Sequence, residues 1–237
     1  MPEAKLPKRF YDTVSLDEGS DGFMILLDGK KVRTPARADL CVASKVLAEA
    51  LQREWNAQKD HINPLAMPMT KRANTTLDRV YGNEEELVKE IIEYAGADLL
   101  CYRAGDPEDL VELQCAQWDP VLEWISEDLG VEFLAEKGIS HFAQPRQSLD
   151  QVRSVFAIKS FYELTPLYSI TTLTGSALLT LAHAHGFLSA NELWTAANVD
   201  EDWQISKWGG DDEAVKRRKA RRAEMDEDVR FFELVRG

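Results

Sequence analysis

The spacing of hydrophobic positions changes near residue 44 and again near residue 60. Before residue 44, short apolar and β-branched runs separated by turn residues predict a small antiparallel sheet. Its expected strands are 10–14, 23–27, 30–34 and 40–42, with a turn at 17–22 between the first two. Asp28-Gly29 suits the positive φ angles of a tight hairpin turn. Apolar residues then recur at helical spacing from Val46 to Trp55, which predicts a helix over 44–58 that covers the sheet.

Beyond residue 70 the pattern is mostly helical. Residues 60–70 contain Pro64 and Pro68 and are predicted to be an extended connection between domains. Residues 166–185 mix leucines with small residues and carry no charge, which predicts one helix inside a bundle. Short extended pieces are expected at 98–103 and 131–134. Helix starts are indicated by a capping box or by a cap residue before proline at Asn83 with Glu86, Ser148 with Gln151, Ser189 with Glu192, Asp106-Pro107, Asp119-Pro120 and Thr165-Pro166. Pro120 is expected either to start a new helix or to kink a longer one.

These patterns predict an α+β protein of two domains. A small N-terminal antiparallel β-sheet domain with a helix is expected over residues 1–66, followed by a larger, mainly helical domain over 67–237. The chain of 237 residues exceeds the usual size of one domain. Its apolar fraction of 44% is sufficient for packed cores.

Charge and cysteine content narrow the range of partners and compartments. The formal net charge of −13 argues against broad attraction to nucleic acid or anionic membranes, whereas a cationic or amphiphilic protein partner fits. Cys41, Cys101 and Cys115 are scattered and odd in number, which favours reduced thiols. The N-terminal residues show neither a signal core nor a transit peptide, and no apolar run approaches the ~20 residues that cross a bilayer. We therefore expect a bacterial cytoplasmic protein without a membrane span.

Motifs for cofactor and covalent chemistry are missing from the sequence. It contains no Gly-x-x-x-x-Gly-Lys-Ser/Thr, Gly-x-Gly-x-x-Gly or Gly-x-Ser-x-Gly pattern, so we expect no nucleotide cofactor and no serine nucleophile of that type. His183 and His185 lie two positions apart and would point about 200° from each other on a helix, so they cannot chelate one ion unaided. Capping of a helix C-terminus is their alternative role. No metal is expected.

The basic run 216–222 is open to two interpretations. Alone it resembles a nucleic-acid patch. Three four-residue spacings of opposite charge cross it, however, and these predict a solvated helix stabilised by ion pairs. The pairs are Asp212 with Lys216, Glu213 with Arg217, and Arg222 with Asp226. Met225, Val229 and Phe232 would form the inward face of that helix.

Residues 199–211 combine two tryptophans, a glutamine and four carboxylates. Trp203 and Trp208 would lie roughly 140° apart on a helix, so they do not form one apolar stripe. At least one indole is expected to meet something outside the chain's own core, although both could be core anchors. The acids Asp200, Glu201 and Asp202 could solvate a helix start, dock onto basic side chains of a partner, or hold a catalytic pair or cation.

Several separate blocks of sequence together resemble one known family. They are Lys8-Arg-Phe-Tyr11, Leu27-Asp-Gly-Lys-Lys-Val-Arg-Thr-Pro35, Glu54-Trp-Asn-Ala-Gln58, Met67-Pro-Met69, Asp98-Leu-Leu-Cys-Tyr-Arg103, Gln117-Trp-Asp-Pro120 and Asp200-Glu-Asp-Trp-Gln204 with Trp208-Gly209. In order, spacing and identity these blocks resemble the ATP12 family, the assembly chaperones of the F1 sector of ATP synthase, from about Lys8 to the C-terminus. Many members carry a histidine shortly after the Trp-Gly pair, where this chain has Ala214 and Val215, so no role of that imidazole carries over.

The resemblance implies a chaperone rather than an enzyme. Such a protein would bind the unassembled α subunit of F1 without using ATP, prevent its aggregation, and be replaced by the β subunit. No cofactor follows, a monomer is favoured, and relatives work in the mitochondrial matrix. We expect Glu201, Trp203, Gln204 and Trp208 to bind the partner. The alternative is a hydrolase or metal-dependent enzyme that uses the acidic C-terminal segment, and behind it a nucleic-acid adaptor that uses the basic run.

Overall fold

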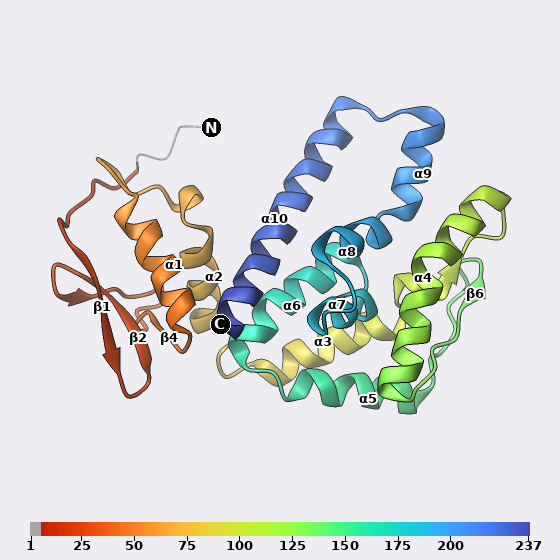
Figure 1. Cartoon of the computed structure of the whole chain (residues 1–237), viewed down its shortest axis with the longest axis horizontal. Coiled ribbons are helices and arrows are strands. Elements are labelled where there is room, and N and C mark those ends of the chain that lie inside the picture. Colours follow the sequence, from red (N-terminus) through yellow and green to blue (C-terminus); the bar gives the residue numbers. More distant parts are fainter. Residues whose placement is uncertain (1–5) are drawn as a thin grey trace. The chain divides into compact units, whose positions relative to one another are not determined.

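The computed structural model describes residues 6–237, which divide by their internal contacts into two compact units (Figure 1). The first unit comprises the described residues up to Asn83 together with Ser160–Pro166 and Glu227–Gly237. The second comprises Glu84–Lys159 and Leu167–Asp226. This division differs from the predicted break at 66/67, because the first unit continues to residue 83 and takes in two later segments. An independent folding boundary at 66/67 stays a prediction.

The first unit contains the small antiparallel sheet that the sequence predicts. Its strands are β1 (Val14–Gly19), β2 (Gly22–Leu27), β3 (Lys30–Lys31) and β4 (Cys41–Val42). Strand β2 pairs with all the others, and β1 pairs with it along its whole length. The turn at Asp28-Gly29 is confirmed, with φ of 48° and 74°.

The first strand lies later than predicted. Residues 10–13 are not part of it, because Tyr11 is buried against the following helix and donates its hydroxyl to the Trp55 carbonyl oxygen at 2.7 Å. The Thr13 amide donates to the Asp28 carboxylate at 2.8 Å. The predicted turn at 17–22 shortens to residues 20 and 21, because an edge strand tolerates Asp17 and Glu18 on its solvated side.

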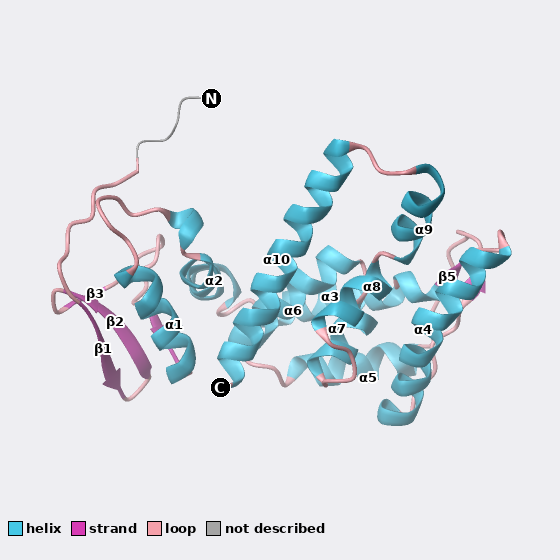
Figure 2. Ribbon diagram, turned by 45° about the horizontal axis from the view of Figure 1, so that its top comes forward, coloured by secondary structure: helices cyan, strands magenta, loops and turns pink. Residues whose placement is uncertain are grey.

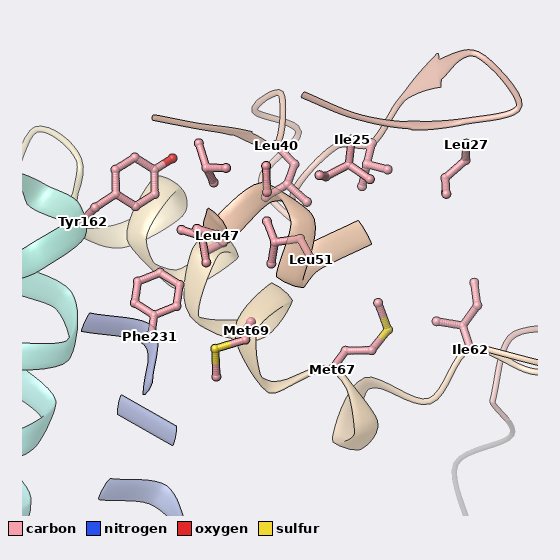
Figure 3. Close-up of a cluster of buried hydrophobic side chains, with 14 of the residues drawn as sticks. Ile25, Leu27, Leu40, Leu47, Leu51, Ile62, Met67, Met69, Tyr162 and Phe231 are labelled. Carbon is pink, nitrogen blue, oxygen red and sulfur yellow. The ribbon is translucent and has the colours of Figure 1, made fainter. Parts of the chain in front are cut away.

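Helix α1 (Lys45–Asn56) covers this sheet, as predicted. Ser44 caps it by accepting a hydrogen bond from the Leu47 amide at 3.3 Å. Figure 3 shows the core that results, in which helix side chains face the sheet. Its labelled members are Ile25, Leu27, Leu40, Leu47, Leu51, Ile62, Met67, Met69, Tyr162 and Phe231, all buried.

The prediction of an extended connection at 60–70 is wrong. The segment contains a 3₁₀ turn, η1 (Pro64–Ala66), and the start of α2 (Pro68–Thr75), which runs on into a π-helical turn, η2 (Thr76–Val80). Pro68 suits the first helical position. The orphan amides of Met69 and Thr70 donate to the Glu54 carboxylate at 2.7 and 2.8 Å, so α1 supplies the cap that the local sequence lacks.

The second unit is mainly helical, which confirms the α+β class (Figure 2). Its chain order is α3 (Glu84–Gly96), η3 (Leu99–Cys101), β5 (Tyr102–Arg103), α4 (Glu108–Leu129), β6 (Glu136–Lys137) and α5 (Arg146–Ala157), then α6 (Phe161–Thr174), α7 (Ala177–Ala184), α8 (Ala190–Ala197), α9 (Val199–Trp208) and α10 (Asp212–Arg236). The first residues of α6 and the last of α10 belong to the first unit. Strands β5 and β6 pair in parallel, so short strands do persist here, although 131–134 is not one.

Residues 166–185 form two helices instead of the predicted one. Pro166 lies inside α6, and the chain breaks at Gly175, where φ is 71°. Ser176 then caps α7 by accepting from the Leu179 amide at 2.9 Å. The buried Asp98 carboxylate accepts from the Ser176 hydroxyl at 2.7 Å and from the Leu178 amide at 3.0 Å. Burial of α7 inside its unit is as predicted.

Cap predictions elsewhere have mixed outcomes. The capping box of Ser189 and Glu192 is confirmed at the start of α8. Ser148 is not a cap, because α5 begins before it and its hydroxyl donates to the Glu132 carbonyl oxygen. Pro120 lies within the continuous helix α4. Among residues 6–237, no helix combines the length and apolar character needed to cross a bilayer.

Candidate partner-binding site

Helix α9 carries the four residues predicted to bind a partner, and it lies in the second unit. It follows α8 directly through Asn198, whose carbonyl oxygen accepts from the Asp202 amide at 2.8 Å. Asp200, Glu201 and Asp202 occupy its first turn, where carboxylates are favoured by the helix dipole. Gly209 ends the helix with a φ of 77°, a conformation that suits glycine.

The acids of the first turn are held by other helices of the same unit. Arg218 of α10 forms an ion pair with Glu201 at 3.5 Å and a short hydrogen bond with Asp202. Asp200 accepts from the Gln114 side-chain amide of α4 at 2.7 Å. These contacts tie the first turn of α9 to α4 and to α10, so this helix start is only partly solvated. Glu201 and Asp202 still expose 36% and 48% of their side chains.

The two tryptophans lie together near the end of α9. Their rings meet edge to face with centroids 5.3 Å apart, although their Cβ positions diverge around the helix. Trp203 is half-buried, whereas Trp208 is 73% exposed. Trp208 therefore lies outside the core, and its contact with something beyond the chain stays a prediction. The two rings touch, but one is half-buried and the other exposed, so they do not form one buried apolar stripe.

A charged pair supports the half-buried indole. Lys207 lies over the Trp203 ring at 5.6 Å and forms an ion pair with Asp109 of α4 at 2.6 Å. Hydrogen bonding from Lys207, with the Trp203 side chain beside it, lowers the pKa of Asp109, so this acid stays ionised. The Trp203 indole Nε1 is nevertheless buried without a hydrogen bond of acceptable geometry. Gln204 is exposed and, among the described residues, its side chain forms no hydrogen bond.

Sequence reasoning missed the residues that position this helix. The sequence places Arg218 only within the basic run, yet this residue lies 5.7 Å from the Trp194 ring and is mostly buried. Asp109 and Gln114 belong to a helix far away in sequence. They contribute to the site only through Lys207 and Asp200 of α9, so no local sequence motif could indicate them.

The basic run is largely occupied by contacts within the protein. The predicted pairs Glu213 with Arg217 and Arg222 with Asp226 are confirmed at 3.3 and 2.8 Å. Arg222 also donates to Asn191, and Arg221 to the Leu173 carbonyl oxygen. The third predicted pair, Asp212 with Lys216, does not form. Met225, Val229 and Phe232 are buried, as the helical spacing predicts.

Other candidate chemistry is dispersed. Among residues 6–237, no group of three or more His, Cys, Asp or Glu side chains is arranged to hold a metal ion. His185 faces Asp128 at 3.6 Å, and His183 Nδ1 lies 2.8 Å from the Leu188 carbonyl oxygen, so the two imidazoles diverge as expected. What the α9 region offers is an exposed indole beside a glutamine and half-exposed carboxylates, an arrangement suited to contact with another protein.

Two crystal structures of bacterial proteins share this fold. Atp12 from Paracoccus denitrificans matches with a TM-score of 0.93 and 33% sequence identity, covering 97% of this chain and 98% of that one. A protein from Agrobacterium tumefaciens, described as a candidate chaperone, matches with a TM-score of 0.90 and 42% identity, covering 96% of this chain and 86% of that one. The fold is therefore that of an Atp12-type chaperone along nearly the whole chain.

The family follows from a separate comparison. The family model of the ATP12 chaperone protein matches residues 8–126, which run from near the start of the described chain into α4. The chain belongs to the ATP12 family. The resemblance noted in the sequence is thereby confirmed, and membership of a chaperone family implies a protein that acts by binding.

Proposed function

We propose that this chaperone serves the assembly of F1 ATP synthase by binding the unassembled α subunit and covering the surface that later meets the β subunit. The observation that carries the proposal is Trp208, a large indole that is 73% exposed on a helix whose first-turn acids are tied to α4 and α10. Tryptophan is among the residue types that are enriched at the energetic centres of protein interfaces.

Physical chemistry supports a passive mechanism. An obligate interface exposed before assembly is a large apolar patch and an aggregation hazard. A chaperone has only to bind that patch reversibly, because the β subunit displaces it by making the more extensive contact. No phosphate-cradling motif occurs in the sequence, so ATP hydrolysis is not part of the proposal.

The proposed contact residues are Glu201, Trp203, Gln204 and Trp208. Trp208 would bury its free face on the client, and Gln204 offers an unpaired amide beside it. Glu201 would orient the encounter with basic side chains of the client, an effect that acts on association rate more than on affinity. Trp203 supports Trp208 through the edge-to-face contact. We also propose that the protein works as a monomer in the bacterial cytoplasm.

The test measures aggregation of purified α subunit by light scattering. Equimolar chaperone should suppress scattering with or without ATP, and size-exclusion chromatography should recover one complex of the two proteins. An unrelated protein of similar negative charge is the control for general electrostatic effects. Unchanged scattering, or suppression that requires ATP hydrolysis, would contradict the proposal.

A further inference from the structure

A second candidate surface lies in the first unit, away from α9 in sequence. A cavity of about 480 Å³, open to solvent, lies beside the end of α1, the turn η1, and helices α2 and η2. All of its lining residues belong to the first unit. Its volume falls within the range of about 300–1,000 Å³ that ligand pockets occupy. Its apolar walls include Pro35, Ile62, Pro64 and Met67, and Figure 3 shows Ile62 and Met67 at one end of the core.

Unpartnered buried polar atoms concentrate at this cavity. Among the described residues, five buried side-chain polar atoms form no hydrogen bond, and three of them belong to cavity-lining residues: Trp55 Nε1, Thr70 Oγ1 and Asn74 Oδ1. The other two belong to Trp203 and Arg218 of the α9 region. Each such atom costs about 1–3 kcal/mol unless something pairs with it, so their concentration calls for an explanation.

The two clearest of these atoms have complementary roles. The Thr70 side chain also acts on the Glu54 carboxylate, where it helps to offset the burial that raises the pKa of that acid. Trp55 Nε1 can only donate a hydrogen bond, whereas Asn74 Oδ1 is an acceptor. A peptide group carries one acceptor and one donor, so a single extended backbone can satisfy both.

Apolar and basic residues at the margin of the cavity indicate which side chains a bound segment would carry. Leu65 of η1 is 93% exposed beside Pro64, so the apolar surface continues beyond the cavity. Lys71 and Arg79 are exposed cavity-lining residues, and no ion pair engages them among the described residues. Asp78 accepts hydrogen bonds from Thr34 and the Ala36 amide. On a chain with a net charge of −13, this cationic margin favours an acidic residue in the ligand.

We propose that this cavity binds an extended segment of the client polypeptide. The segment places an apolar side chain between Ile62 and Met67, its carbonyl oxygen accepts from Trp55 Nε1, and its amide donates to Asn74 Oδ1. An acidic side chain next to the apolar one faces Lys71 and Arg79. The inference rests on the proposed function, because the segment belongs to the protein that the chaperone holds.

The direct test observes the Trp55 indole by proton–nitrogen correlation NMR on the full chain, with the Trp55→Phe variant used to assign its signal. The probes are overlapping short synthetic peptides that span the F1 α subunit. A peptide with adjacent apolar and acidic residues should shift the Trp55 indole signal. Binding of peptides without such a shift, or no binding by any peptide, would overturn the inference.

A second test uses the whole client and two matched variants. Leu65→Asp places a charge on the margin of the cavity, and Ile139→Asp is its control, because the two side chains are 93% and 96% exposed and neither supports the fold. Leu65→Asp should weaken binding of whole α subunit by about tenfold, whereas Ile139→Asp should bind like the parent. Equal binding by all three proteins defeats the cavity inference alone. Failure of the parent to bind α subunit defeats the proposed function itself.

Discussion

Replacing Trp208 by alanine separates binding from folding. The side chain is 73% exposed and its ring meets Trp203 edge to face at 5.3 Å. Such a pair contributes about 0.5–1.5 kcal/mol, so the free energy of unfolding should fall by no more than about 1.5 kcal/mol. An interface-centre tryptophan cut to alanine costs about 2 kcal/mol or more of binding, or roughly thirtyfold in Kd.

Phe10→Ala is the matched control for that experiment. Phe10 is 72% exposed and its ring meets Tyr11 edge to face with centroids 5.4 Å apart. Phe10→Ala therefore removes an exposed aromatic ring and one edge-to-face contact, as Trp208→Ala does. Urea unfolding and titration with purified α subunit would be measured on both variants and the parent. Trp208 is not a contact residue if Trp208→Ala binds as tightly as Phe10→Ala, or if its loss of binding is matched by loss of the folded state.

Other perturbations test the electrostatics of the structure. Glu201→Gln removes one charge of a partly exposed ion pair that contributes about 1 kcal/mol or less, so the fold should persist while binding of α subunit weakens at low salt and depends less on salt. An unchanged salt dependence would exclude Glu201 as a contact. Arg72→Leu leaves Asp228 buried beside an apolar side chain, so the free energy of unfolding measured in urea should fall by about 3–5 kcal/mol. Glu227→Gln changes the 44% exposed partner of Arg72 and should lower it by about 1 kcal/mol or less. Burial raises the pKa of Asp98 from 3.8 to about 6, so the folded state holds a proton that the unfolded state has lost. The free energy of unfolding should therefore fall by up to about 3 kcal/mol as pH rises from about 4 to 6, a slope that Asp98→Asn should lack.

Local patterns predicted those parts of the fold whose causes are local. The hairpin at Asp28-Gly29, the helix capped by Ser44 and the box of Ser189 with Glu192 all depend on residues a few positions apart. The start of α2 was missed because its cap is Glu54, a side chain of the preceding helix. A contact with α1 therefore stabilises a helix start in a segment whose two prolines favour an extended chain.

The candidate site shows the same limit. The sequence singled out α9 by its unusual composition, and it predicted that an indole would lie outside the core. It could not show that Arg218 pairs with Glu201 and Asp202, because these residues belong to two different helices, α10 and α9. It also gave no sign of the cavity at Trp55 and Asn74, whose orphaned polar atoms appear only when burial is known.

The measurement that bears most directly on the proposed function is displacement of the chaperone by the β subunit. A purified complex of the chaperone with α subunit would be mixed with purified β subunit, and the species separated by size-exclusion chromatography. We expect free chaperone and a complex of α with β, because under the proposed function both proteins compete for one surface of α. A stable species containing all three proteins, or a chaperone that β cannot displace, would contradict it.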